Sequence, residues 1–166
     1  QGDPLDPATK MGAMVDNNHA SKVEDFLNVG KGEANLITGG SRFAIGDSDA
    51  FIQPTIFADV PKDSTIARDE IFGPVLAIQT FETENEAIKM ANNSLYGLAA
   101  SVWTADLTRA MDFSDKLHVG TVSVNTVDAL SAMTPFGGMK QSGFGRDLSI
   151  HSFDKYTALK TIWVKY

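Results

Sequence analysis

The 166-residue sequence contains no cysteine and only three histidines. The missing thiol excludes disulfide bonds, thiolate zinc sites, iron–sulfur clusters and cysteine nucleophiles within this chain. The histidines lie far apart, and neither a His-x-x-x-His spacing nor a paired carboxylate accompanies them: His19, His118 and His151. We therefore expect no metal site in this chain.

Positive charge and long hydrophobic runs are also scarce. The chain has 14 Lys and Arg against 21 Asp and Glu, a net charge of −7, whereas non-specific nucleic-acid binding needs an excess of basic side chains. No segment approaches the roughly 20 apolar residues that cross a bilayer, and residues 1–4 do not resemble a secretory signal. We expect a cytoplasmic protein that binds neither nucleic acid nor membrane.

The remaining composition is that of an ordinary folded domain. Hydrophobic residues make up 43% and charged residues 21%, and the length fits a domain of about 100–150 residues. The sequence does not begin with Met and opens on a turn-rich segment, residues 2–7. These features suggest a piece of a longer chain.

Hydrophobic periodicity predicts a helix over residues 16–31, which Gly30 and Gly32 are expected to stop. Residues 51–57 are expected to form one strand, which Pro54 makes either an edge strand or a bent one.

The central region predicts a regular alternation of strands and helices. Thr83, with Glu86 three residues later, has the pattern of a capping box at a helix start. The expected order is a strand over 75–81, a helix from 83, a strand over 97–103, a helix from 106 and a strand over 121–124. Short connections between such elements are typical of βαβ units with parallel strands, so we predict an α/β fold.

The C-terminal region changes character. Residues 135–146 are too rich in glycine for a helix or a strand, and a short helix is expected over 148–153. Residues 157–166 are β-rich and too apolar to lie free in water. We expect this edge to pair either within the chain or with another subunit.

Two groups of residues are candidates for a binding site. Glu70 and Phe72 lie two positions apart before a strand, so both can project to one side of an extended segment. A carboxylate beside an aromatic ring suits a ribose, whose hydroxyls donate to the acid. Phe136 lies where the chain leaves the sheet and is able to line a pocket. From the residues alone, core packing remains the commoner role for both phenylalanines.

A small flavodoxin-like binding domain is a weaker alternative. It requires a phosphate-binding turn, and none follows the strand predicted at 75–81. Gly143 and Gly145 match only part of a dinucleotide-binding fingerprint, since the third glycine is absent.

Four longer motifs together resemble the C-terminal portion of the aldehyde dehydrogenase superfamily. They are Glu70-Ile-Phe-Gly-Pro-Val75, Ala91-Asn-Asn-Ser-Leu-Tyr-Gly-Leu-Ala-Ala100, Gly120-Thr-Val-Ser-Val-Asn125 and Pro135-Phe-Gly-Gly-Met-Lys-Gln-Ser-Gly143. The resemblance extends over the whole chain. Its ending, residues 145–163, is most similar to bacterial γ-glutamyl-γ-aminobutyraldehyde dehydrogenases of polyamine catabolism.

The resemblance implies oxidation of an aldehyde to a carboxylic acid with NAD or NADP. It implies that Glu70 binds the nicotinamide ribose and that Phe72 packs near it. It assigns Phe136 to the aldehyde channel and Asn125 to a position beside that channel.

The mouth of the channel corresponds to the variable loop over residues 126–134. In this loop Leu130 contributes apolar surface, and Asp128 suits a cationic, amine-bearing substrate.

The nucleophilic cysteine and the general base of the family lie upstream of the matched region. We therefore expect no catalytic residue in this chain and no activity from the chain alone. Residues 1–156 are expected to be part of the catalytic domain, and residues 157–166 a strand that joins subunits into a homo-oligomer. The alternative is a truncated, non-catalytic module that binds full-length subunits or itself.

Overall fold

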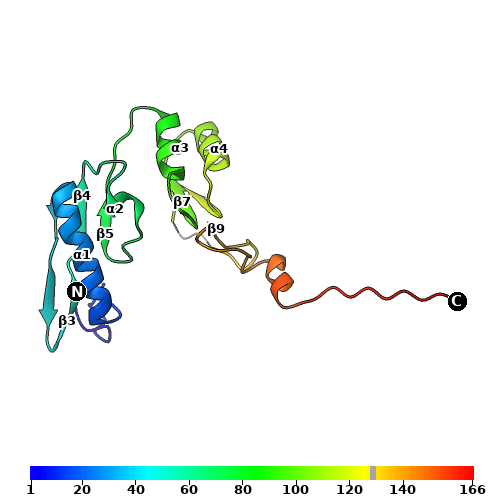
Figure 1. Ribbon diagram of the computed structural model, residues 1–166, viewed down its shortest axis with the longest axis horizontal. Coiled ribbons are helices and arrows are strands. Elements are labelled where there is room, and N and C mark those ends of the chain that lie inside the picture. Colours follow the sequence, from blue (N-terminus) through cyan, green and yellow to red (C-terminus); the bar gives the residue numbers. More distant parts are fainter. Residues whose placement is uncertain (128–129) are drawn as a thin grey trace. The chain divides into compact units, whose positions relative to one another are not determined.

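The computed structural model describes residues 1–127 and 130–166, and its helices and strands confirm the α/β class (Figure 1). The chain forms two compact units, Gln1–Glu82 and Thr83–Tyr166. In the part of the chain that the structure describes, no helix is long and apolar enough to cross a membrane.

The first unit is organised around helix α1, Asn17–Glu33. The Asp16 side chain caps it by accepting a hydrogen bond from the His19 amide at 2.7 Å. Its apolar face is buried and contributes Val23 and Leu27 to a core cluster with residues of two strands, a short helix and a loop: Ile52 and Phe57, Ile66, and Val60.

Helix α1 does not stop at its glycines, so that prediction is wrong. The helix continues through Gly30 and Gly32 to Glu33. A Cβ at Gly30 would lie 2.7 Å from the ring of Phe57, which packs against the helix at this point. Gly30 therefore allows close packing of α1 on a strand.

The strands of the first unit form two small sheets. Strands β1 (Asn35–Thr38), β4 (Thr55–Ala58) and β5 (Val75–Ala77) pair in the order β1-β4-β5, with β4 and β5 parallel. Strands β2 (Arg42–Ile45) and β3 (Ser48–Ile52) form an antiparallel hairpin. The single strand predicted over 51–57 is thus two strands in different sheets, because the chain changes direction around Pro54, which has no N–H for a ladder.

A short helix, α2 (Thr65–Arg68), connects β4 to the segment before β5. The carboxylate of Glu33, at the end of α1, accepts hydrogen bonds from the Thr65 amide at 3.2 Å and the Thr65 hydroxyl at 2.9 Å. The Ile66 amide donates to the same carboxylate at 3.4 Å. One side chain therefore joins the end of α1 to the start of α2.

The second unit begins with helix α3, Glu84–Asn92, whose N-cap is Thr83 as predicted. Its strands include β6 (Tyr96–Gly97), β7 (Ala99–Val102) and β8 (Thr121–Val124), and helix α4 (Leu107–Lys116) connects β7 to β8. Strands β7 and β8 are parallel, which confirms this βαβ unit.

The other predicted βαβ unit would join the two compact units, since β5 belongs to the first and β7 to the second, and it stays a prediction. Within its own unit β5 pairs with β4 over three residues, and β7 pairs with β8. An apolar run predicts a strand but not its neighbour, because pairing depends on residues distant in sequence.

The end of the chain is irregular. Strand β9 (Met139–Lys140) pairs with β6, and the predicted short helix is a 3₁₀ helix, η1 (Ile150–Lys155). Residues 157–166 are exposed, form no strand in the described chain, and extend away from η1 as the red trace in Figure 1. Among the described residues this segment has no strand partner, and its pairing with another subunit stays a prediction.

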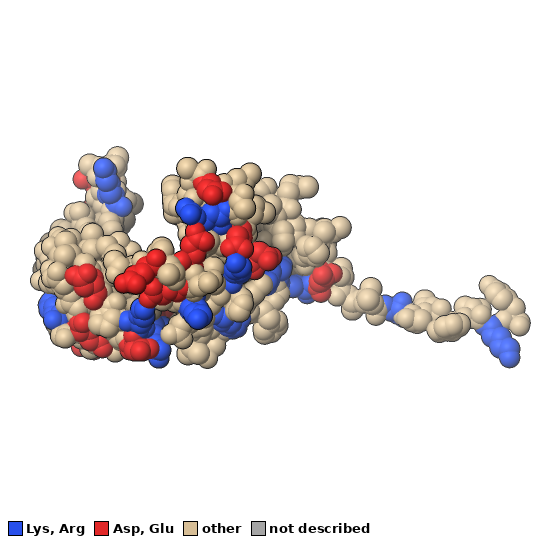
Figure 2. All heavy atoms as spheres, turned by 90° about the horizontal axis from the view of Figure 1, so that it is seen from above, with Lys and Arg blue, Asp and Glu red and all other residues tan. Residues whose placement is uncertain are grey.

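Acidic and basic side chains are interspersed on the face shown in Figure 2. The extended segment carries Lys160 and Lys165 but no acidic residue.

Candidate functional site

The structure places the sequence-predicted site residues in two groups, one in each unit. Glu70 and Phe72 belong to the first unit, in the turn between α2 and β5. Leu130 and Phe136 belong to the second.

Phe72 is a surface residue and not a core residue. Its side chain is 73% exposed, and Glu70 is exposed as well. The backbone of Phe72 has φ of +56°, in the left-handed region that bulky side chains avoid at a cost on the order of 1–3 kcal/mol. A residue held in this conformation with its ring in solvent is typical of a binding site.

The turn is held from helix α1 by a contact that sequence reasoning missed. The His19 Nε2 atom lies 2.7 Å from the Phe72 carbonyl oxygen. The two rings are arranged edge to face, with centroids 6.1 Å apart at 77°. No local pattern links these residues, because they come from different elements distant in the sequence.

Glycine and proline fix the exit from this turn. A Cβ at Gly73 would lie 2.8 Å from Val23 on the buried face of α1, so the backbone lies directly against the helix. The Pro74 carbonyl accepts a hydrogen bond from the Thr55 amide at 2.8 Å, at the start of the β4–β5 pairing. The Glu70–Phe72 segment is therefore bounded by rigid structure on its C-terminal side.

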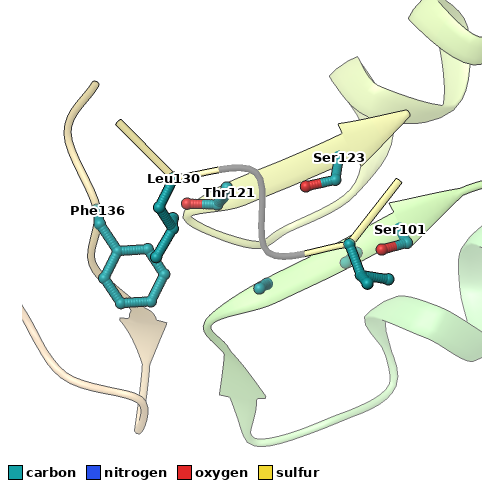
Figure 3. Close-up of a pocket in the computed structure, with 8 residues that line it drawn as sticks. Ser101, Thr121, Ser123, Leu130 and Phe136 are labelled. Atoms are coloured by element: carbon teal, nitrogen blue, oxygen red, sulfur yellow. The ribbon is translucent and has the colours of Figure 1, made fainter. Parts of the chain in front are cut away.

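The second group lines a cavity of about 390 Å³, within the range of small-molecule sites. Figure 3 shows the Leu130 side chain beside the ring of Phe136, with Thr121 and Ser123 on β8 and Ser101 on β7. The lining residues are Ala99, Ala100, Ser101, Thr121, Ser123, Val127, Leu130 and Phe136. One side of the cavity is thus aromatic and aliphatic, and the other carries hydroxyl groups.

The loop that carries Phe136 is fixed to the sheet through its backbone. Phe136 and Asp147 exchange two backbone hydrogen bonds, of 2.9 and 2.7 Å. A Cβ at Gly120 would overlap the carbonyl oxygen of Gly137, so only glycine permits this approach. These contacts set the position of the Phe136 ring at the cavity.

One predicted pocket residue, Asn125, is not among those that line this cavity. Asn125 follows β8 with φ of +54°, and its amide makes two 2.9 Å hydrogen bonds with the backbone of Thr104. Its side chain therefore joins the ends of β7 and β8, and it is not among the lining residues. Asp128 lies outside the described residues.

In the described part of the chain, no three His, Asp or Glu side chains lie close enough together to hold a metal ion. The residues described at the two sites carry carboxylate, hydroxyl and aromatic groups.

Comparisons with known proteins agree on one family. The sequence model of the aldehyde dehydrogenase family matches residues 1–162. The NADP/NAD-dependent aldehyde dehydrogenase PuuC of Escherichia coli (strain K12) is 47% identical over 98% of this chain and 32% of its own length. Betaine aldehyde dehydrogenase 1 of Rhizobium meliloti (strain 1021) is 48% identical over 98% of this chain and 34% of its own length.

Solved structures agree as well. A mutant of the indole-3-acetaldehyde dehydrogenase AldA of P. syringae, in complex with NAD+ and IAA, superposes with a TM-score of 0.95 at 47% identity, over 99% of this chain and 34% of that one. The γ-glutamyl-γ-aminobutyraldehyde dehydrogenase of Burkholderia cenocepacia J2315 has a TM-score of 0.92 at 48% identity, over 96% and 32%. The chain thus spans about a third of the length of the relatives it matches.

Proposed function

Because this chain belongs to the aldehyde dehydrogenase family, we propose that it forms the C-terminal portion of an enzyme that oxidises an aldehyde to a carboxylic acid with NAD or NADP. The observation that carries the proposal is the turn at Glu70 and Phe72. Both side chains are exposed, and the turn is held in an unfavourable backbone conformation. The nucleophilic cysteine and the general base belong to the remainder of that enzyme.

The residues of the turn fit a nicotinamide ribose. The Glu70 carboxylate is able to accept hydrogen bonds from two ribose hydroxyls, and charged acceptors make the stronger hydrogen bonds. The exposed ring of Phe72 offers an apolar face beside the sugar. The bound cofactor supplies the hydride acceptor, and these two side chains orient it.

We propose that the cavity beside Phe136 belongs to the aldehyde channel. Leu130 and Phe136 provide apolar surface for the body of the substrate, and hydroxyls line the opposite side. Asp128, which lies in the sequence between Val127 and Leu130, suits an aldehyde that bears an amino or γ-glutamylamino group. The similarity of residues 145–163 to enzymes of polyamine catabolism supports this substrate class.

The assembly proposed for the whole enzyme is a cytoplasmic homo-oligomer. Its subunits are joined through residues 157–166, which are apolar, exposed and unpaired in the described chain. The alternative, a non-catalytic module that binds other subunits through the same segment, predicts association without dehydrogenase activity.

Expression of the complete reading frame that contains these residues tests the proposal. We expect NADH or NADPH formation with γ-glutamylamino and amino aldehydes, with betaine aldehyde and indole-3-acetaldehyde as comparison substrates. The 166-residue chain by itself should form none. A complete protein that forms no reduced cofactor with any of these aldehydes would contradict the proposal and favour the module.

The substitution Glu70→Gln tests the role of the turn. It should lower kcat/KM for the cofactor about 10- to 100-fold, since a hydrogen bond to a charged group is worth about 1.5–3 kcal/mol. Asp69→Asn is the matched control, because Asp69 is the adjacent exposed carboxylate. It should change kcat/KM by less than about twofold. Equal effects of the two substitutions would contradict the assignment of Glu70.

A further inference from the structure

The turn at Phe72 requires support from outside its own segment. Its backbone φ of +56° is disfavoured for a phenylalanine, and its exposed ring has little packing that compensates. Without support, the segment would relax toward an ordinary backbone conformation and lose its present arrangement of Glu70 and Phe72.

His19 provides that support through a hydrogen bond and through a contact between the two aromatic rings. A carbonyl oxygen only accepts, so the 2.7 Å contact with Phe72 O requires a proton on His19 Nε2. One neutral tautomer and the charged imidazolium both carry this proton. The edge-to-face contact of the two rings adds a second attachment to the same residue.

Helix α1 makes His19 a rigid support. His19 lies in the first turn, where its own amide donates to the capping carboxylate of Asp16. The neighbouring helix positions Ala20, Val23 and Leu27 are fully buried and anchor the helix in the core. Gly73 lies against Val23, so the turn contacts the helix at two adjacent points.

We propose that His19 is a positioning residue for the cofactor. It holds the Phe72 carbonyl so that Glu70 and the Phe72 ring are arranged for a nicotinamide ribose before the cofactor binds. This inference rests on the function proposed for Glu70 and Phe72. A preorganised turn avoids an ordering cost on binding, so its loss weakens cofactor binding more than the chemical step.

Three substitutions in the complete enzyme separate the contribution of the His19 N–H donor from that of its aromatic ring. His19→Gln retains an N–H donor at similar reach, His19→Phe retains an aromatic ring without a donor, and His19→Ala removes both. His19→Phe and His19→Ala should raise the Kd and KM for NAD+ about five- to tenfold, the size of one hydrogen bond. His19→Gln should stay within about twofold of the wild type, and kcat at saturating NAD+ should change little in all three.

Asp25→Ala, an exposed position on the same helix, is the control for general effects on α1. It should leave Kd, KM and the thermal midpoint unchanged. If His19→Ala does not fold, the Phe and Gln variants still decide the matter. Equal affinities of the Gln and Phe variants, or wild-type affinity of the Ala variant, would overturn the inference.

The Glu70→Gln variant distinguishes this failure from that of the proposed function. If Glu70→Gln weakens NAD+ binding and His19→Phe does not, the positioning role is wrong while the turn remains the cofactor site. If Glu70→Gln leaves NAD+ binding unchanged, the proposed site and the role of His19 are both overturned.

Discussion

A methyl group added to helix α1 has opposite consequences at two neighbouring glycines. At Gly30 the new Cβ would lie 2.7 Å from the Phe57 ring, whereas at Gly32 nothing lies within 4 Å. Gly30→Ala should therefore destabilise the protein by about 1–3 kcal/mol through overpacking. Gly32→Ala should stabilise it by up to ~1 kcal/mol, because alanine is the better helix former.

Thermal midpoints of the two variants, measured side by side in the same buffer, check this prediction. Gly32→Ala is the control for helix propensity, since both substitutions change it equally. A stabilising Gly30→Ala would show that the contact with Phe57 adjusts without cost.

The same pair of residues shows what a sequence pattern does not contain. Both glycines follow a helical periodicity and indicate a helix end, yet only the structure reveals that Gly30 faces Phe57. Phe72 is a similar case. Its apolar character favours the core, whereas its position in a turn held by His19 exposes it.

At the scale of elements, Glu33 connects α1 to α2 and makes that junction sensitive to acid. Desolvation raises the pKa of Glu33, but the hydrogen bonds from Thr65 and Ile66 outweigh it and hold the pKa below its ordinary value. A lowered pKa in the folded state contributes stability above the unfolded pKa, about 4.3. That contribution is lost as the pH falls through the lower, folded pKa.

Glu33→Gln tests this linkage. At pH 7 the variant should have a lower thermal midpoint than the wild type, and the difference should narrow below about pH 4 as the wild-type carboxylate becomes protonated. Asp25→Asn, at an exposed acid on the same helix, should change the thermal midpoint only slightly, and that small difference should not narrow at acid pH. A Glu33→Gln deficit that persists unchanged at acid pH would contradict the charge-based explanation.

Elements with local signals were predictable, and their pairing was not. The capping residue Thr83 and the apolar face of α1 suffice to predict α3 and α1. The hairpin of β2 and β3 was missed although its two-residue turn, Gly46-Asp47, is a local hairpin signal, and the bend predicted at Pro54 is a full break between two sheets.

At the scale of the whole molecule, the extended segment 157–166 presents apolar side chains that nothing in the described chain covers, including Leu159, Ile162 and Trp163. Exposed apolar strands associate with other chains. We expect the 166-residue chain to form dimers or larger assemblies, seen by light scattering across a dilution series. Deletion of residues 157–166 should lower the number of chains in each assembly, as calculated from the measured mass.

The variant Lys160→Ala/Lys165→Ala is the matched control, because it removes the charges of the segment and keeps its apolar residues. It should associate as the intact chain does. If the truncated chain forms assemblies with as many chains as the intact one, the association depends on other residues.

The family and its α/β fold were predictable at this scale, since several long motifs recur in order. The cavity beside Phe136 depends on the close approach of the backbone at Gly120 to the backbone at Gly137. The amino-acid composition does not reveal this contact.

The backbone contact between Gly120 and Gly137 also has a consequence for protein engineering. Gly120 and Gly137 bring the backbone together on either side of β8 and the loop that follows it. This contact involves main-chain atoms, so it does not depend on the side chains of residues 126–134. Any exchange of residues 126–134 should therefore leave this main-chain contact intact, provided that Gly120 remains a glycine.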